Sequence, residues 1–330
     1  MTILLTKNLS RQWSRIGPRG IYGQSLLELS KEEKKIYAIS ADLGNSSGLD
    51  RYKQTFPERF LNIGIAEQNL VGFASGLSTV GFNVFISSFA PFITMRACEQ
   101  VRLNLGYMKS NVKIVAIGSG LSMGFLGNSH FGLEDISIIR SIPNIPIICP
   151  CDCFEVYKAL EALSRYEGPA FLRLTGAPPT SIIYQEDYEF KIGKSISIKE
   201  GNQVLILSHG TILGNALQAV KKVEEEKSYS FHVENVHTLT PLDKKVVDLI
   251  KNFSLIITIE EHSLIGGLSS IVSEIITDGN LKNTRHLKLG LPPKFLNSGT
   301  YEQLLEEYDL STDKIYKTII KELKIYFERK

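Results

Sequence analysis

The sequence has no long apolar run and almost no net charge. None of its 330 residues lie in a stretch of the ~20 apolar residues that a membrane-spanning helix needs. A net charge of +2 gives no reason to expect a nucleic-acid or membrane partner. The opening letters, MTILLTKNLSRQW, lack the regions of a secretory signal. We therefore expect a cytoplasmic protein that binds neither nucleic acid nor membranes.

Cysteine is also scarce. Four cysteines in a chain of this length do not make a disulfide framework. Three of them, Cys149, Cys151 and Cys153, alternate in CPCDCFE, whereas zinc sites usually show C-x-x-C and a second ligand pair. The six histidines form no metal-binding pattern either. We expect small buried cysteines at a strand end and no metal ligands among the site residues.

Several common catalytic motifs are missing. The sequence has no GxxxxGK[ST] phosphate loop, no GxGxxG between a strand and a helix, and no GxSxG nucleophile turn. Local motifs of this kind therefore leave the chemistry undecided.

What the sequence does have is a regular alternation of strand-like and helix-like segments. The segments KKIYAISAD, NVFISSF, NVKIVAIGSG, IPIICPCD and PAFLRL read as strands, and helix-like segments such as CFEVYKALEALSRYEG separate them. This order predicts an α/β fold, a parallel sheet with covering helices. A charged, linker-like stretch and a second α/β unit follow, so we predict a first domain over residues 1–189 and a second over 190–330.

The segment GIAEQN places Glu67 between a short strand and the apolar, helix-like LVGFASGLSTVG. Such surroundings rarely hold a charge. One interpretation is a glutamate at a helix N-terminus that accepts hydrogen bonds from backbone amides. The other is a functional carboxyl group in a poorly solvated pocket at a strand end, where ligands of parallel sheets usually bind.

The longer segment FPERFLNIGIAEQN resembles the thiamine-diphosphate enzymes of the transketolase family. RGIYGQSLLEL, SSFAPFITMRACEQVR, GNSHFGLEDISIIRSIPNIPIICPCD and GPAFLRL resemble the family's pyrimidine-binding domain. VENVHTLTPLD, TIEEHSLIGGLSS and NSGTYEQLLEEYDL resemble its C-terminal domain. The resemblance implies a pyrimidine-binding parallel-sheet domain followed by a smaller α/β transketolase C-terminal domain.

The family's N-terminal domain has no counterpart here. That domain holds the diphosphate and its metal through a GDG-then-Asn motif, and no GDG occurs in this sequence. The resemblance thus implies the C-terminal subunit of a split transketolase, which transfers a two-carbon ketol unit between sugars. It also implies a partner subunit that holds most of the thiamine diphosphate and its Mg²⁺ or Ca²⁺, in a dimer of heterodimers.

The resemblance assigns roles to particular residues. Glu67 matches the glutamate that hydrogen-bonds the cofactor's aminopyrimidine ring, and Phe89 and Phe92 match the aromatic pair that packs against this ring. Arg96 lines the site or pairs with a neighbouring acid. His130, in GNSHFG, matches a catalytic histidine that reaches the substrate and the reaction intermediate.

The substrate side departs from the family pattern. Arg19 and Ser46 match part of the sugar-phosphate site, but Leu126 stands where an acid is common, Gly118 where a histidine is common, and Gly176 where an arginine is common. Losing an arginine removes a strong, directional contact to an anion. We therefore expect at least one substrate that is not an ordinary pentose or hexose phosphate, such as a non-phosphorylated or nucleotide-linked sugar.

Three alternatives remain open. The beta subunit of a 2-oxo-acid dehydrogenase shares this domain pair, although EEHSLIGG and the GxxH…LED pattern favour a transketolase. Deoxyxylulose-phosphate synthase is a further relative but is normally one longer chain. A non-catalytic scaffold subunit would keep the fold without the chemistry.

His262, in EEHSLIGG, is expected to be structural or to lie at a subunit contact.

Overall fold

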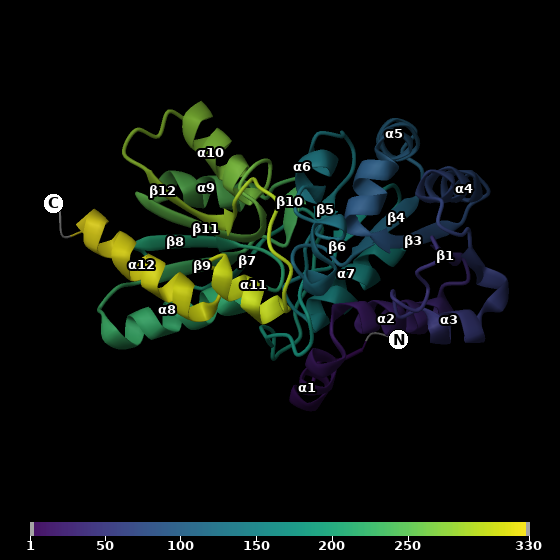
Figure 1. The fold of residues 1–330 in the computed structure, drawn as a ribbon, viewed down its shortest axis with the longest axis horizontal. Helices are drawn as coiled ribbons and strands as arrows, with labels where there is room; N and C mark the ends of the chain where they lie inside the picture. The colour runs from purple at the N-terminus through teal and green to yellow at the C-terminus, as the bar shows by residue number, and fades with distance from the viewer. Residues whose placement is uncertain (1–2, 328–330) are drawn as a thin grey trace.

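Two β-sheets form the centre of the molecule, with helices on both faces (Figure 1). The computed structural model describes residues 3–327. The first sheet has seven strands in the order β10-β5-β6-β4-β3-β1-β2. Its strands are β1 (Ile36–Ser40), β2 (Phe60–Asn62), β3 (Asn83–Phe89), β4 (Val112–Ile117), β5 (Ile147–Ile148), β6 (Ala170–Arg173) and β10 (Thr238–Thr240). All neighbours are parallel except β10 and β5, which confirms the predicted sheet.

The helices around the first sheet largely follow the predicted alternation. They are α1 (Lys7–Ile16), α2 (Pro18–Glu32), α3 (Asp50–Thr55), α4 (Glu67–Thr79), α5 (Cys98–Gln100), α6 (Asp135–Arg140) and α7 (Cys153–Arg165). Helix α7 begins where it does because the Asp152 carboxylate accepts the Glu155 amide at 2.8 Å. The short helices η1 (Pro57–Arg59) and η4 (Gly124–Ser129) lie in connecting loops.

The helix-like segment MRACEQVRLNLGY is less regular than its sequence predicts. Two π-helical segments, η2 (Phe92–Arg96) and η3 (Val101–Tyr107), flank the single turn of α5. Such π-helical turns are rare and are frequent at functional sites. η2 carries two of the predicted site residues, Phe92 and Arg96.

The second sheet has five strands in the order β12-β11-β8-β9-β7. They are β7 (Ile196–Lys199), β8 (Val204–Ser208), β9 (Phe231–Asn235), β11 (Leu255–Ser263) and β12 (Arg285–Leu291), and β7 is antiparallel to β9. The helices of this part are α8 (Leu213–Glu226), α9 (Lys244–Asn252), α10 (Leu268–Asp278), α11 (Tyr301–Glu307) and α12 (Thr312–Phe327). β10 follows the predicted boundary near residue 190 in the chain but joins the first sheet, so the domain division stays a prediction.

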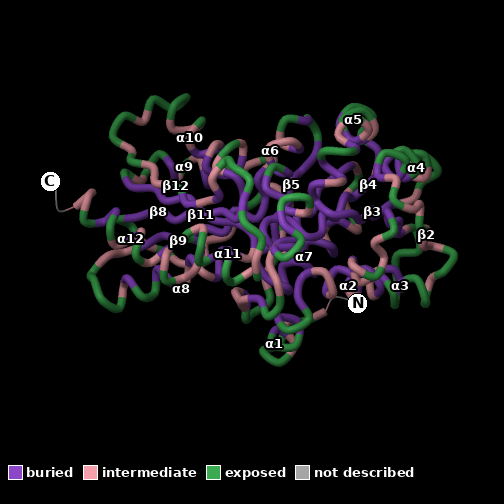
Figure 2. Tube along the Cα trace, viewed as in Figure 1, coloured by how far each residue is buried: buried purple, intermediate pink, exposed green. Residues whose placement is uncertain are grey.

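Two apolar layers, one on each side of the sheets, hold the molecule together. One layer contains Leu26 of α2 and Val220 of α8, and the other contains Val71 of α4 and Ile250 of α9. Each layer therefore runs from the first sheet to the second, and Figure 2 shows both sheets buried between them. Burial of this continuous apolar surface supplies the main driving force for packing the two domains together.

The clustered cysteines are structural, as predicted. Cys149 and Cys151 follow β5 and are fully buried, and Cys153 opens α7 with 3% of its surface exposed. Among residues 3–327, no three His, Cys, Asp or Glu side chains are grouped so that they could hold a metal ion. No helix in the described range is long and apolar enough to cross a membrane.

Candidate active site

Most of the predicted site residues follow strands of the first sheet. β3 ends at Phe89, β4 ends at Ile117 just before Gly118, and β2 ends at Asn62 shortly before Glu67. The carboxyl ends of parallel strands lie along one edge of a sheet, where open α/β sheets bind their ligands. The topology thus gathers side chains from separate parts of the chain at this edge.

Glu67 is the first residue of α4 and is almost completely buried, with 1% of its surface exposed. The chain turns into this helix at Gly64, whose φ of 79° suits glycine. One carboxylate oxygen accepts a hydrogen bond from Arg96 Nη1 at 2.7 Å, and the other lies 3.4 Å from Ser88 Oγ. Backbone amides in residues 3–327 make no hydrogen bond to this carboxylate, so the helix-capping interpretation does not describe it.

The cation that pairs with Glu67 is open to solvent. The Arg96 side chain is 48% exposed, and its guanidinium lies 4.6 Å from the centre of the Phe92 ring. A buried carboxylate is costly unless it is paired. Because this partner lies at the surface, an incoming group that binds the carboxylate can replace it without leaving a buried arginine unpaired.

Three aromatic rings form a corner beside this ion pair. Phe89 and Phe92 meet edge to face with ring centres 5.8 Å apart, and the His130 ring lies 5.4 Å from Phe89 and 5.2 Å from Phe92. The imidazole Nδ1 of His130 is 2.9 Å from Ser129 Oγ. The structure therefore brings together all five residues predicted for the cofactor and the chemistry, namely Glu67, Phe89, Phe92, Arg96 and His130.

A pocket of about 440 Å³ opens beside this corner. Its lining includes residues that the sequence did not single out: Pro91, Met95, Asn128, Ser129, Phe131, Glu134 and Phe295. Phe295 comes from the second domain and is 88% exposed. The exposure of a large aromatic side chain can mark a binding surface, but it is visible only in the structure and not in the sequence.

Arg19 and Ser46 lie together in a separate pocket of about 330 Å³. The Arg19 guanidinium reaches the Ser46 carbonyl oxygen at 3.5 Å, and partial burial lowers the pKa of this arginine, which stays charged. The pocket is also lined by Asn45 and Gly176. It shares no lining residue with the pocket beside Phe92.

Gly118 and Gly176, the two glycines that the sequence analysis singled out, have no room for a side chain. Gly118 has φ 67°, and a Cβ there would lie 2.9 Å from Phe89 and 2.8 Å from Met123. Gly176 has φ 84°, and its Cβ would lie 2.6 Å from Thr211 Oγ1. Neighbouring side chains thus occupy the space at both positions. Leu126, the third position that departs from the family pattern, is 40% exposed.

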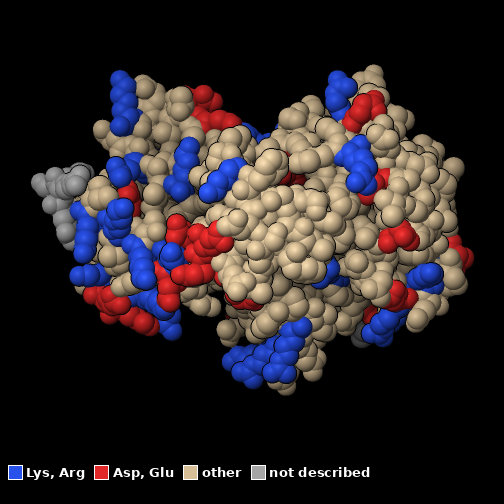
Figure 3. All heavy atoms as spheres, in the orientation of Figure 1, with Lys and Arg blue, Asp and Glu red and all other residues tan. Residues whose placement is uncertain are grey.

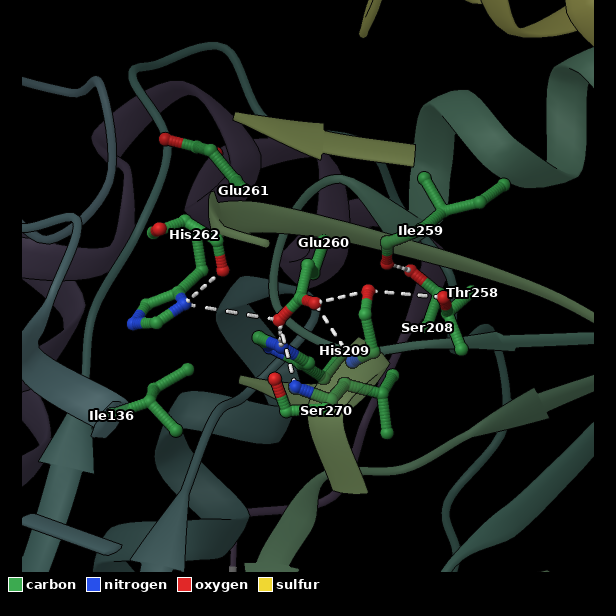
Figure 4. A network of polar contacts seen from close by, with 12 residues as sticks. Ile136, Ser208, His209, Thr258, Ile259, Glu260, Glu261, His262 and Ser270 are labelled. Atoms are coloured by element: carbon green, nitrogen blue, oxygen red, sulfur yellow. Dashed lines mark hydrogen bonds and ion pairs between the residues drawn. The ribbon is translucent and has the colours of Figure 1, made fainter. Parts of the chain in front are cut away.

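His262 lies in a fully buried cluster behind the loop that carries His130. Its Nδ1 donates to the Ser263 carbonyl at 2.8 Å, its Nε2 is 3.6 Å from Asp135 Oδ1, and burial lowers its pKa to about 4. Figure 4 shows His209 and His262 pointing toward Glu260, whereas Glu261 points away from them. His262 is fully buried within this chain, which fits the structural interpretation, and its side chain is not at the surface.

Comparison with known proteins places this fold in a family. Residues 15–177 match the family model described as "Transketolase, pyrimidine binding domain", and residues 193–315 match "Transketolase, C-terminal domain". A protein of Methanocaldococcus jannaschii named as a transketolase C-terminal section is 37% identical over 93% of this chain and 96% of its own length. The chain belongs to the transketolase family.

Other relatives within the transketolase family match nearly the whole length of this chain. One of the subunits of the apulose-4-phosphate transketolase of Phocaeicola vulgatus is 31% identical over 94% of this chain and 98% of its own. A solved structure described as "Split gene transketolase, inactive beta4 tetramer" superposes with a TM-score of 0.82 at 35% identity. The superposition covers 92% of this chain and 97% of the chain in that solved structure.

Proposed function

We propose that this chain is one subunit of a thiamine-diphosphate-dependent enzyme that transfers a two-carbon ketol unit from a ketose to an aldehyde. The observation that carries the proposal is the buried Glu67 carboxylate, held by a solvent-exposed arginine beside an aromatic corner. A carboxylate with a replaceable partner is what a site needs when a ligand must hydrogen-bond to it.

The residues at this corner fit an aminopyrimidine ring. Phe89 and Phe92 offer apolar faces for a flat ring, and Glu67 offers an acceptor for a ring nitrogen that carries a proton. The chain has no GDG segment for the diphosphate. We therefore assign the diphosphate and its Mg²⁺ or Ca²⁺ mainly to a transketolase N-terminal subunit, in a cytoplasmic dimer of heterodimers.

Each side chain then has a role. When bound, thiamine diphosphate supplies the electron sink that lets a carbon–carbon bond beside a carbonyl break and re-form. Glu67 holds a proton at the pyrimidine nitrogen, and the two phenylalanines exclude water and fix the ring. His130 exchanges a proton with the substrate oxygen through Nε2, because Ser129 engages Nδ1.

We assign the substrate's anionic group to the pocket lined by Arg19 and Ser46. Gly176 also lines this pocket and contributes no side chain to it. Next to it, α1 presents Lys7, Arg11 and Arg15 at every fourth position on its exposed face. Figure 3 shows basic atoms gathered over this helix. Four cations in this region suit a sugar with more negative charge than one phosphate, such as a nucleotide-linked sugar.

Turnover with a diphosphate-binding partner subunit tests the proposal. The mixture is assayed for ketol transfer with ketose donors and with three acceptors: ribose 5-phosphate, a free aldose and a nucleotide-linked aldose. We expect cofactor-dependent turnover that is lost in Glu67→Gln and is not best with xylulose 5-phosphate and ribose 5-phosphate. An assembled complex with no turnover would favour a scaffold role. Best activity with those two pentose phosphates would overturn the substrate assignment alone.

A further inference from the structure

The loop that carries His130 is attached to the second domain at both of its ends. At the start of the loop, the Leu121 amide donates to Glu261 Oε1 at 2.7 Å. At its end, the Ser263 amide donates to the Leu133 carbonyl at 3.0 Å. A proposed catalytic histidine of the first domain is therefore held in place by contacts to the second.

Asn128, in the middle of this loop, makes a two-way contact with the second domain. Its Nδ2 donates to the Leu296 carbonyl oxygen at 2.7 Å, and its Oδ1 accepts the Leu296 amide at 2.8 Å. Leu296 is anchored in an apolar layer with 4% of its surface exposed. A side-chain amide that both donates and accepts fixes direction as well as distance.

The surfaces around this clamp touch without spare room. The Gly299 amide donates to the Gly124 carbonyl at 3.1 Å, and a Cβ on Gly124 would lie 2.5 Å from the Gly299 oxygen. Gly127 has φ 70°, and its Cβ would lie 2.3 Å from Ser298 Oγ. Backbone is packed against backbone here, so the loop can shift only if segment 296–299 shifts with it.

His130 follows directly from this fixed backbone. Its amide donates to the Gly127 carbonyl at 2.9 Å, and Ser129, the residue after the clamp, contacts its Nδ1 at 2.9 Å. Nε2 has no hydrogen-bond partner within residues 3–327. Asn128 and Ser129 line the same pocket as Phe295, the residue before Leu296.

We propose that Asn128 is a positioning residue for His130, and that through it segment 295–299 of the second domain becomes a working part of the active site. The clamp aims the imidazole while Phe295 forms the facing wall. Small errors in the orientation of a catalytic group cost rate even when the fold is intact. The inference rests on the proposed function, because that function gives His130 its role.

Histidine NMR on the full chain tests the positioning directly and needs no turnover. The imidazole signals of His130, identified by their loss in His130→Gln, are compared in wild type, Asn128→Ala and Asn215→Ala. Asn215 of α8 is a matched control, because its side chain donates to the Leu310 carbonyl at 3.0 Å away from the site. We expect the His130 signals to shift or broaden in Asn128→Ala alone, with the other histidines unchanged. Superimposable His130 signals in all three proteins would overturn the proposal.

Kinetics of the complex with its partner separate positioning from general stability. For Asn128→Ala we expect kcat to fall at least tenfold, with cofactor affinity and thermal midpoint close to those of Asn215→Ala. Asn128→Asp keeps the acceptor and loses the donor, so it should fall between wild type and Asn128→Ala. Equal loss of kcat, cofactor affinity and stability would reduce Asn128 to a structural role. A wild-type complex without turnover would instead refute the proposed function and leave the NMR result standing.

Discussion

Two clusters in this molecule combine an acid, an arginine and a histidine, and they differ in how the arginine is held. In the site cluster, Arg96 pairs with Glu67 while 48% of its side chain stays exposed. In the sealed cluster, Arg173 pairs with Asp135 at 2.8 Å, and neither side chain is exposed at all. Arg173 also donates to the carbonyls of Gly132 and Glu261, both at 3.0 Å.

The difference separates a site from a scaffold. An arginine with three interior acceptors cannot leave, so Asp135 is not available to a ligand. Arg96 donates to one acid side chain and is half-exposed, so a ligand that replaced it at Glu67 would leave the guanidinium in contact with water. The two clusters contain the same residue types, and what differs between them is the exposure of the arginine that pairs with the acid.

The largest effect is expected from breaking the sealed pair. Arg173→Leu leaves Asp135 buried without its cation, which should lower the free energy of unfolding by about 3–5 kcal/mol in urea denaturation. The matched control is Arg140→Leu, which removes a pair with Glu274 at the surface and should cost no more than about 1 kcal/mol. Similar losses in the two variants would refute the contrast. If Arg173→Leu does not fold, Arg173→Lys gives the same comparison with a smaller change.

Glu67→Gln should do the opposite, with a large effect on chemistry and a small one on stability. The amide still accepts a hydrogen bond from Arg96, but it cannot hold a proton for the cofactor, so kcat of the complex should fall about a hundredfold or more. Glu99→Gln, at an exposed glutamate, serves as the control. Turnover within tenfold of wild type would show that Glu67 is not the acid that matters.

Glu261, a third buried acid, should make the stability of the protein depend on pH. This buried carboxyl accepts from the Leu121 amide and from the Tyr301 hydroxyl, and burial raises its pKa to about 7. Because the pKa of Glu261 is higher in the folded protein than in the unfolded chain, the folded protein holds this proton more tightly. The contribution to stability is therefore present at low pH and is lost as the pH rises through about 7.

Glu261→Gln stays neutral; its Oε1 can accept the Leu121 amide while its Nε2 donates to the Tyr301 hydroxyl oxygen, so that this second contact is reversed. The difference in unfolding free energy between variant and wild type should therefore move in the variant's favour between pH 5 and pH 8. The expected change is at most about 3 kcal/mol, at ~1.4 kcal/mol for each unit of pKa. A difference that stays constant over this range would mean that Glu261 is ionised throughout.

The strands of the first sheet could be predicted from the sequence for a physical reason, and the proposed cofactor residues could be predicted from the family resemblance. β3 follows NVFISSF residue by residue and ends at Phe89, while Phe92 and Glu67 lie in the segments after β3 and β2, at the edge where parallel topology brings strand ends together. Alternation of strand-like and helix-like segments is enough to predict the parallel sheet, whereas the family resemblance is needed to pick out these three residues.

The contacts that sequence reasoning missed join segments far apart in the chain. Asn128 meets Leu296 across 168 positions, and no local pattern predicts that pairing. β10 joins the first sheet from beyond the predicted boundary, and the π-helical segment η3 replaces regular helix in the second half of the helix-like segment MRACEQVRLNLGY. These features depend on how the two domains pack, which is a property of the assembled fold.

The most direct test of the account is a calorimetric titration of thiamine diphosphate with Mg²⁺ into this chain, into a transketolase N-terminal subunit, and into their mixture. We expect tight binding by the mixture alone, and markedly weaker binding when the mixture contains Glu67→Ala. A correctly assembled mixture that does not bind the cofactor, or that binds it equally well without Glu67, would contradict the claim that this carboxylate forms half of a shared site.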